Sequence, residues 1–413
     1  MGEPLGAVCV CCGTAYPLGL DFEGCPKCAT EHFRSNLTLV YDYKKIPGSV
    51  FAGRLPEGDH SLWRYHPLLP VVRDAAVSLG EGGTPLLRIR RVGEDLECPA
   101  LWLKDESRNP TGSFKDRFCA VAVSKAARAG ARTVAVASTG NQGASLAAYA
   151  AAAGLGCVVL TLETLPEPLR VAMEIMGAHV VAVPTPADRW KVLREGVERE
   201  GWFPVSNYLA PPAGSNYYGI EGYKTIAYEI WEQLGRRAPR AVAVPTCYGD
   251  GLYGIWKGFR ELKAMGLIEE PPRMIAAEIS GWLTRSLEEG KPWEGESAVR
   301  SSAAFNLLAS RSTWQALAAL RESRGEAVQV GEDAILSMQQ TLARREGIYG
   351  EASGVAALAA LGDLARKGQA GEAGEVVAVL TSAGMKDPAA TARTLPPLRR
   401  AEPTLKAVMG AIP

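Results

Sequence analysis

The sequence predicts an α/β protein built from two open, parallel β-sheets, with a small cysteine-rich module at the N-terminus. Short runs of β-branched and small apolar residues alternate with longer helical stretches, which is the pattern of βαβ units. The runs lack polar alternation, as expected for strands buried on both faces of a parallel sheet. Two Cys-x-x-Cys pairs precede this alternation.

The order of these runs predicts how the chain divides. The predicted strands are Ala100–Lys104, Thr133–Ala137, Cys157–Thr161, His179–Val183, Ala241–Val244, Met274–Ala277 and Val376–Leu380. Between Tyr41 and Leu79 the sequence is irregular and rich in Pro, Gly and aromatic residues, which is typical of a linker that wraps a domain. We expect a cysteine module at residues 1–38 and a small α/β domain at 99–204. The small domain would be inserted into a large α/β domain made of residues 39–98 and 205–413.

Composition restricts the partners and the compartment. The chain has 413 residues, with 45 basic and 45 acidic side chains, so it lacks the basic excess that nucleic acids or anionic membranes require. We find no apolar run long enough to span a bilayer and no signal peptide. Nine cysteines, an odd number, favour reduced thiols and a cytoplasmic location.

The cysteine pairs predict a structural zinc site. Cys9 and Cys12 form one Cys-x-x-Cys pair, and Cys25 and Cys28 form the second. Four thiolates on two tight turns suit tetrahedral Zn²⁺ in a zinc ribbon and leave no open coordination position for catalysis. Cys11 and His32 are alternative ligands, and the alternative to a zinc site is a ribbon that folds without metal or a chance clustering of cysteines.

Three glycine-rich turns are candidates for chemistry, because ligands of open α/β sheets bind at the carboxyl edge of the strands. Ser138–Gly143 and Tyr248–Gly254 each lie between a predicted strand and a helix. Free N–H groups at such helix starts bind anions, so the former suits a carboxylate and the latter a phosphate. Each turn taken alone is equally well explained as an ordinary strand-to-helix connection.

The remaining turn, Asn109–Asp116, carries Lys115 in the first turn of a predicted helix. A cation there opposes the helix dipole unless the amine is neutral or paired with an anion. A covalent imine linkage near a phosphate would relieve this conflict. On this turn alone, a solvated surface lysine would be the better interpretation.

Several strings together resemble one family. Asn109-Pro-Thr-Gly-Ser-Phe-Lys-Asp-Arg117 is similar to the cofactor-lysine motif of threonine synthases and related fold-type-II, tryptophan-synthase-like pyridoxal-phosphate enzymes. Four further strings agree with the family in the same order. They are Ser78-Leu-Gly-Glu-Gly-Gly-Thr-Pro85, Ala137-Ser-Thr-Gly-Asn141, Glu221-Gly-Tyr-Lys-Thr225 and Thr381-Ser-Ala-Gly-Met-Lys-Asp-Pro388. The resemblance extends from about Ser78 to Pro388 and implies that the cofactor binds between the two sheet domains.

The resemblance implies roles for individual residues. Lys115 would hold the cofactor as a Schiff base and move protons at the substrate Cα. The other implied cofactor contacts are Phe114 at the ring, Asn141 at its phenolic oxygen, Thr381 at its nitrogen, and Gly249, Asp250, Gly251, Leu252 and Tyr253 at its phosphate. The implied contacts to the substrate carboxylate are Ser138, Thr139, Asn141 and Gln142.

This sequence departs from the family pattern at several positions, and the departures bear on which substrate the protein binds. Gly219 stands where threonine synthases commonly have an arginine that binds the substrate phosphate. Ser382 and Ala383 replace a Gly-His pair, and Asp250 introduces a carboxylate into the phosphate loop. Without the arginine, binding of O-phosphohomoserine would depend on Lys104 and Thr84, with Asn216 or Lys224 as further candidates.

The leading interpretation is a pyridoxal-phosphate lyase or synthase whose amino-acid substrate has a leaving group at Cβ or Cγ, most simply threonine synthase. The alternative is β-replacement or β-elimination on serine, threonine or phosphoserine, as in ammonia-lyases and cysteate synthases. A silent binding protein that kept the fold would not need Lys115. A zinc-ribbon interaction module with an enzyme-like body is a further alternative, which chelation that disrupts partner binding while sparing catalysis would indicate. Relatives are commonly dimers, so a homodimer is expected.

Overall fold

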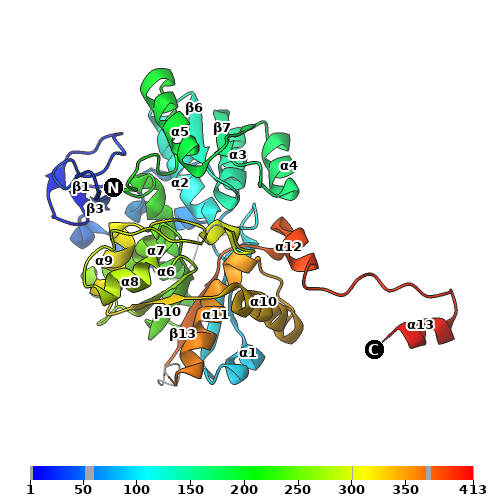
Figure 1. Ribbon diagram of the computed structural model, residues 1–413. Coiled ribbons are helices and arrows are strands. Elements are labelled where there is room, and N and C mark those ends of the chain that lie inside the picture. The colour runs from blue at the N-terminus through cyan, green and yellow to red at the C-terminus, as the bar shows by residue number, and fades with distance from the viewer. Residues whose placement is uncertain (1–2, 52–59, 300, 369–373, 413) are drawn as a thin grey trace.

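The computed structural model describes residues 3–51, 60–299, 301–368 and 374–412, which form three separate sheets (Figure 1). The N-terminal sheet has the order β2-β1-β3 and is antiparallel. Its strands are β1 (Gly6–Cys9), β2 (Ala15–Tyr16) and β3 (Leu37–Val40). Short 3₁₀ helices follow in the predicted linker: η1 (Tyr43–Lys45), η2 (Gly48–Phe51), η3 (Leu62–Leu68) and η4 (Arg73–Ala75). Residues 52–59 of that linker lie outside the described part.

The largest sheet has the order β12-β11-β10-β13-β5-β4 and is parallel except for β4 at one edge. Its strands, in spatial order, are β12 (Glu326–Gln329), β11 (Arg273–Glu278), β10 (Ala241–Pro245), β13 (Val376–Leu380), β5 (Leu101–Asp105) and β4 (Leu86–Arg88). The central strands β10 and β13 are buried along their whole length, which explains their uninterrupted apolar sequences.

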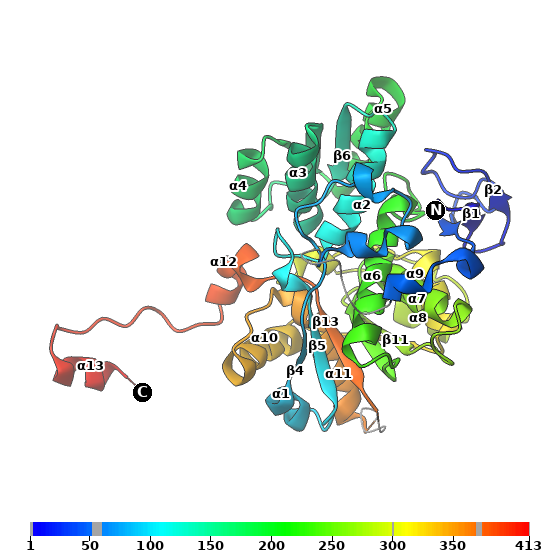
Figure 2. The same cartoon turned by 180° about the vertical axis from the view of Figure 1, so that it is seen from behind.

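Helices cover both faces of this sheet (Figures 1 and 2). Alternate residues of β10 divide between two cores: Val242 and Val244 pack toward α6, α7 and α9, whereas Ala241 and Ala243 pack toward α11. The helices of this domain are α1 (Arg90–Asp95), α6 (Tyr217–Gln233), α7 (Asp250–Ala264), α8 (Trp282–Glu288), η6 (Phe305–Leu307), α9 (Trp314–Glu322), α10 (Glu332–Glu346) and α11 (Ala352–Arg366). The result is a three-layer α/β/α domain.

The remaining sheet is parallel throughout, with the order β8-β7-β6-β9. Its strands are β6 (Thr133–Ala137), β7 (Gly156–Thr161), β8 (His179–Ala182) and β9 (Phe203–Pro204). The helices around it are α2 (Lys115–Arg128), α3 (Asn141–Ala153), α4 (Glu167–Ile175) and α5 (Pro186–Glu200), with α5 on the side opposite α3 and α4 (Figure 1). Both parallel-sheet domains expected from the sequence are therefore present.

One expected boundary needs correction. The strand at Leu101–Asp105 pairs along its whole length with β13 in the six-stranded sheet, so it belongs to the large domain. The small domain therefore starts after this strand and not at residue 99. The strand's sequence could not reveal this, because a buried parallel strand looks the same in either sheet.

The connection between the domains leads directly to the candidate site. After β5 the chain forms η5 (Glu106–Arg108) and enters α2, which packs against α3 of the small domain and α6 of the large one. At the other end of the chain, η7 (Gly384–Lys386) and α12 (Pro388–Ala392) precede α13 (Leu405–Ala411), which lies apart from the body (Figures 1 and 2). No helix within the described residues combines the length and apolar character that a bilayer crossing requires.

Candidate active site

A cavity lies between the two parallel-sheet domains, at the carboxyl ends of β6, β10 and β13. The space between its walls, including a part that is open to solvent, measures about 940 Å³. Most of the site residues expected from the sequence line it: Phe114, Lys115, Ser138, Thr139, Asn141, Gln142, Gly249, Asp250, Gly251, Leu252 and Thr381. Three turns far apart in the sequence thus meet at one cavity, as the edge rule for α/β sheets requires.

Lys115 is the first residue of α2 and lines the cavity floor. Its Nζ lies 5.0 Å from the ring centre of Phe114 and 5.7 Å from that of Tyr223. Within the described residues no carboxylate forms an ion pair with it. Burial lowers the pKa of Lys115, and the nearby Asp250 and Cys247 oppose this shift only in part. The amine is therefore more easily neutralised than an exposed lysine, as a nucleophilic lysine must be.

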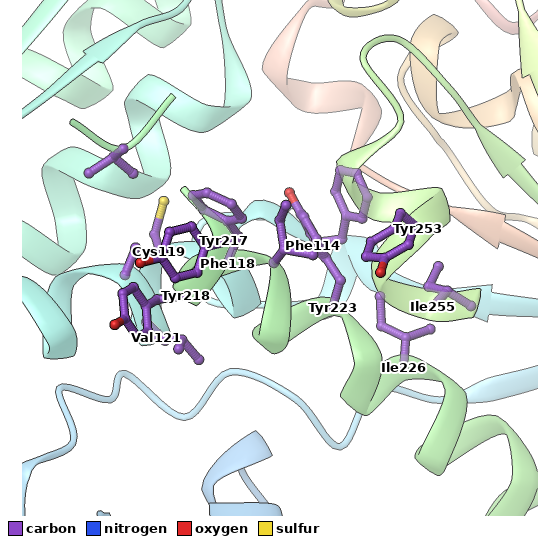
Figure 3. Close-up of a cluster of buried hydrophobic side chains, with 14 of the residues drawn as sticks. Phe114, Phe118, Cys119, Val121, Tyr217, Tyr218, Tyr223, Ile226, Tyr253 and Ile255 are labelled. Atoms are coloured by element: carbon purple, nitrogen blue, oxygen red, sulfur yellow. The ribbon is translucent and has the colours of Figure 1, made fainter. Parts of the chain in front are cut away.

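The two rings next to Lys115, Phe114 and Tyr223, belong to a buried cluster of aromatic and aliphatic side chains (Figure 3). The rings of Phe114 and Tyr223 are 4.9 Å apart and tilted by 34°. Phe114 N–H donates to the Thr381 carbonyl at 2.9 Å, which ties the lysine loop to the end of β13. These contacts fix the start of α2 and hence the direction of the Lys115 side chain.

The turn before α3 is arranged to receive an anion. Ser138 Oγ accepts hydrogen bonds from Gly140 N–H and Gly143 N–H, both at 3.1 Å, which closes the turn. The N–H groups of Asn141 and Gln142 begin the helix and so have no intrahelical acceptor. These free donors and the positive end of the helix dipole suit a carboxylate.

A second free helix start is formed by α7. Gly249 caps it in a left-handed conformation, with φ of 86°, and Asp250, Gly251 and Leu252 are its first residues. Their N–H groups point out of the helix start without intrahelical acceptors. Tyr253 does not share this feature, because its N–H donates to the Gly249 carbonyl at 2.8 Å and its side chain is buried away from the cavity.

Asp250 does not oppose an anion at this turn as strongly as its charge suggests. Its carboxylate accepts hydrogen bonds from Ser215 N–H at 3.1 Å, Ser215 Oγ at 2.6 Å and the Gln315 side-chain amide. These hydrogen-bond donors lie on the side of α6 and α9 and stabilise the negative charge of the Asp250 carboxylate there. The backbone of the turn therefore remains available to a phosphate.

We expect Gly249→Ala to weaken cofactor binding. An added Cβ would lie 2.2 Å from Ala316 Cβ, and the positive φ would strain any L side chain. Overpacking of this kind costs about 1–3 kcal/mol, so affinity for pyridoxal phosphate should fall about ten-fold or more. Fluorescence titration measures the change. Gly235→Ala is the matched control, since φ is 69° there and nothing lies within 4 Å. Equal affinities in both variants would contradict the assignment of this turn.

A buried carboxylate, Glu351, holds one wall of the cavity. It accepts hydrogen bonds from Asn141 Nδ2 at 2.7 Å, from Ser382 Oγ and from Asn306 Nδ2. Burial raises the pKa of Glu351, and the hydrogen bonds from Ser382 and Asn141 oppose the rise. Glu351 is the N-cap residue of α11, but its side chain makes no capping bond, so its role is to orient Asn141.

Several cavity residues carry no sequence signal that we could recognise. They include Arg189, Trp190, Cys247, Phe305, Asn306 and Ser353. Arg189 and Trp190 belong to a surface-like amphipathic helix, and Asn306 lies on the short helix η6. Only the meeting of the two domains brings them to the cavity.

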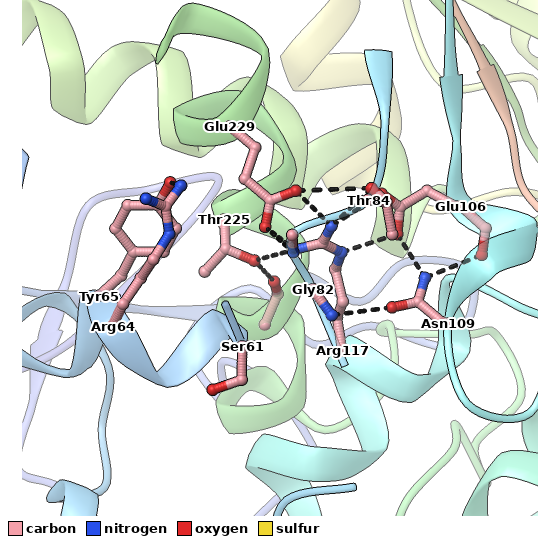
Figure 4. A network of polar contacts seen from close by, with 12 residues as sticks. Ser61, Arg64, Tyr65, Gly82, Thr84, Glu106, Asn109, Arg117, Thr225 and Glu229 are labelled. Carbon is pink, nitrogen blue, oxygen red and sulfur yellow. Dashed lines mark hydrogen bonds and ion pairs between the residues drawn. The ribbon is translucent and has the colours of Figure 1, made fainter. Parts of the chain in front are cut away.

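Thr84 and Lys104 are not brought to the cavity, which corrects their expected role in substrate binding. Lys104 Nζ donates to the Thr84 carbonyl at 2.7 Å, to Glu229 at 2.7 Å and to Gln233 at 2.9 Å. An ammonium has three donors, so none remains for a substrate phosphate. Thr84 Oγ1 donates to Glu106 at 2.6 Å inside the same buried network (Figure 4).

Lys224 and Asn216 are likewise committed elsewhere. Lys224 Nζ donates to Glu221 at 2.6 Å and to Glu261 at 3.1 Å in a fully buried cluster. Asn216 caps α6 by accepting from Tyr218 N–H and Gly219 N–H. Neither residue lines the cavity.

The cavity fits the pyridoxal phosphate that the resemblance implies. Asn141 Oδ1 is buried and has no hydrogen-bond partner among the described residues, so the amide retains capacity for a bound group. Lys115 supplies an amine, and the start of α7 supplies free N–H groups for a phosphate. The amine of Lys115, the amide of Asn141 and the free N–H groups of α7 can therefore meet the aldehyde, the phenolic oxygen and the phosphate of the cofactor.

The four N-terminal thiols also converge. The sulfur atoms of Cys9, Cys12, Cys25 and Cys28 all lie within 4.8 Å of one another. Cys9 Sγ is 3.7 Å from Cys28 Sγ, and Cys12 Sγ is 3.8 Å from Cys25 Sγ. A tetrahedron with Zn–S bonds of about 2.3 Å has edges of about 3.8 Å. The cluster thus has the dimensions of a metal site and excludes Cys11 and His32.

Comparison with known proteins identifies the family of this chain. Residues 77–382 match the family model described as pyridoxal-phosphate dependent enzyme. A threonine synthase of Methanocaldococcus jannaschii is 33% identical over 93% of this chain and 94% of its own. A threonine synthase of Methanosarcina acetivorans is 35% identical over 92% of each chain. Among solved structures, an L-serine ammonia-lyase from Rhizomucor miehei aligns with a TM-score of 0.64 at 18% identity, covering 77% of this chain and 98% of that one.

The solved structure supports the fold alone, since its identity is low. The family match covers the span from the first glycine-rich string to the end of β13, with all three cavity turns inside it. The chain therefore belongs to the fold-type-II family of pyridoxal-phosphate-dependent enzymes.

Proposed function

We propose that this chain is a threonine synthase, which converts O-phosphohomoserine and water to threonine and phosphate. The observation that carries the proposal is one cavity with a lysine at its floor and free helix starts for two different anions. The two curated threonine synthases described above resemble this chain over nearly their whole lengths, which supports the same activity here.

Each residue of the cavity has a distinct role in this reaction. Bound pyridoxal phosphate supplies an electron sink that stabilises negative charge at the substrate Cα. Lys115 anchors the cofactor and moves protons at Cα, a task that suits its lowered pKa. The turn before α3, with Ser138, Thr139 and Gln142, binds the substrate carboxylate. Asn141 is held by Glu351 at 2.7 Å for contact with the cofactor's phenolic oxygen.

The other cofactor contacts follow from position. Phe114 would line the ring, and Gly249, Asp250, Gly251 and Leu252 would hold the phosphate through their N–H groups. Thr381 would offer the pyridine nitrogen a hydroxyl, which cannot keep that nitrogen protonated as a carboxylate would. This setting suits elimination and replacement. In the net reaction the Cγ–O bond breaks and phosphate leaves, while at Cβ one C–H bond is replaced by a bond to the oxygen of water. The proton from Cβ and one proton of water are balanced by the proton that Cγ gains, which makes it the methyl group of threonine, and by the proton that the released phosphate takes up.

Product analysis tests the proposal. Cofactor-loaded protein is incubated with O-phosphohomoserine, and phosphate and amino acids are quantified. We expect equal amounts of phosphate and threonine. Phosphate without threonine, or no phosphate at all, would refute a threonine synthase. The alternative, elimination or replacement on serine, threonine or phosphoserine, would then give pyruvate, 2-oxobutyrate or a substituted product from those amino acids.

We also propose that the four-thiol cluster binds a structural Zn²⁺. The ribbon packs against the catalytic body, since the hydroxyls of Tyr217 and Tyr218 donate to the Gly19 carbonyl at 2.7 and 2.9 Å. Asn36 Nδ2 donates to the Gln315 side chain at 3.1 Å, and Gln315 in turn donates to Asp250. Metal in the ribbon would therefore stabilise the body as well.

Removal of one ligand tests the zinc site. We expect the purified protein to contain about one zinc per chain, and Cys25→Ser to lose that zinc and to unfold at a lower temperature. Plasma emission spectrometry and calorimetry measure the two effects. Cys11→Ser is the control, because Cys11 is an exposed thiol outside the cluster. Full zinc content in Cys25→Ser would argue against the site.

We further propose that the protein works as a homodimer in the cytoplasm. The nine cysteines are free, which suits a reducing compartment. Exposed apolar side chains near the C-terminus, including Leu398, Leu405 and Met409, are typical of a segment that packs on a second subunit. Light scattering of the purified protein measures the mass of the assembly.

A further inference from the structure

Arg189 has an unusual position for a cation. It lies near the start of α5, which a capping box between Thr185 and Asp188 fixes, and it lines the cavity from the small-domain side. The neighbouring Trp190 ring is 6.0 Å from the ring of Tyr248 on the opposite wall. The guanidinium is thus held where the two domains face each other.

The Arg189 guanidinium has no counter-ion among the residues that the structure describes. Its Nε is buried without a hydrogen-bond partner, and no carboxylate within the described residues forms an ion pair with it. Burial lowers the pKa of Arg189, and only Tyr248 and Cys247 oppose this. Arg189 as a whole is half-buried, and a partly buried cation with no partner is unfavourable, a cost that is offset when an anion binds.

Arg189 is also the basic residue that remains available to a ligand among the described residues of the cavity wall. Among the described residues that line the cavity, Lys115 and Arg189 are the basic ones, and Lys115 is committed to the cofactor. Lys104 and Lys224 are tied to carboxylates elsewhere. At Gly219 a Cβ would lie 2.7 Å from the Phe118 ring, so a longer side chain there would displace that ring.

The cavity thus has distinct positions for three anionic groups. The turn before α3 suits a carboxylate, and the start of α7 suits the cofactor phosphate through free N–H groups and the helix dipole. Arg189 belongs to another element, α5, and offers a planar fork of donors that matches a phosphate.

We propose that Arg189 is the specificity-determining residue that binds the distal anionic group of the amino-acid substrate, and that this group is a phosphate. This inference rests on the proposed function and names the residue that selects a phosphorylated substrate. It explains how the site holds a phosphate although position 219 is glycine.

Ligand binding to the cofactor-loaded protein tests the role without turnover. The visible absorption band is titrated with L-2-amino-5-phosphonopentanoate, a stable analogue of O-phosphohomoserine, and with L-2-aminopentanoate, which lacks the phosphonate. In Arg189→Gln we expect affinity for the phosphonate to fall about 100-fold and affinity for the neutral analogue to change less than about three-fold. Arg189→Lys should recover part of the loss. Arg194→Gln, which removes an exposed arginine paired with Glu198 on the same helix, should bind both ligands normally.

Each contrary result has a distinct meaning. Equal losses for both ligands, or unchanged affinity for the phosphonate, would overturn the inference. A weaker affinity for pyridoxal phosphate with unchanged discrimination between the ligands would overturn it too, and would assign Arg189 to the cofactor phosphate. Threonine formation with an unchanged KM in Arg189→Gln would refute the inference and leave the proposed function standing. Arg189-dependent phosphonate binding in a protein that forms no threonine would do the reverse.

Discussion

Replacement of Lys115 by alanine should abolish turnover while leaving the fold intact. The substitution removes the cavity amine that anchors the cofactor and moves protons at the substrate Cα. Loss of a proton-transfer group alone costs about 10²–10⁴-fold in rate, and loss of the covalent anchor adds to this. We therefore expect kcat to fall at least about 1000-fold. Threonine formation under saturating substrate measures it.

Two controls make this result specific. Lys125→Ala changes another lysine of the same helix, outside the cavity, and should retain both activity and the visible band. Added methylamine should restore part of the activity of Lys115→Ala by supplying the missing amine. Activity of the alanine variant near that of the unaltered protein would rule out Lys115 as the anchoring residue.

The largest effect on stability is expected at Arg117, two residues after Lys115. Its guanidinium is fully buried, with Nε 2.7 Å from Glu106 and Nη1 2.7 Å from Glu229 (Figure 4). Burial alone would raise the pKa of Glu229, but Arg117 and Lys104 hold it below its usual range. Arg117→Met leaves these carboxylates buried, and breaking a buried pair in this way costs about 3–5 kcal/mol.

Urea unfolding measures the loss as a shift of the midpoint at an unchanged slope. Adding Glu106→Gln to Arg117→Met should recover part of it, because Glu106 has no other ion-pair partner within the described residues. Arg170→Met is the surface control, since both its acidic partners are exposed, and its midpoint should hardly move. A midpoint for Arg117→Met equal to that of the unaltered protein would show that the network does not stabilise the domain junction.

A local motif predicts its own place in the site where the topology of the sheet fixes that place. Ser138–Gly143 and Tyr248–Gly254 follow parallel strands, and the carboxyl ends of such strands must lie on one edge. Their meeting with Lys115 was therefore predictable once both strands were recognised. The cysteine pairs were predictable for a similar reason, since their spacing sets the turns.

Local sequence patterns do not predict which charged side chains reach the cavity. Lys104 lies on a strand close to the lysine loop, yet a buried glutamate from α6 fixes its ammonium away from the cavity. Arg189 lies in a helix with many exposed charges, and only the packing of α5 against the cavity distinguishes it. Both depend on contacts between residues distant in sequence, for which a single sequence gives no signal.

The most direct test of the central claim is to locate the cofactor on the chain. The protein is loaded with pyridoxal phosphate, reduced with borohydride, digested and mapped by mass spectrometry. We predict that the reduced cofactor is attached to the peptide that contains Lys115, with loss of the visible band in step with the labelling. Attachment to another lysine, such as Lys386, whose Nζ donates to the Thr111 carbonyl at 2.5 Å, or no attachment at all, would contradict the account.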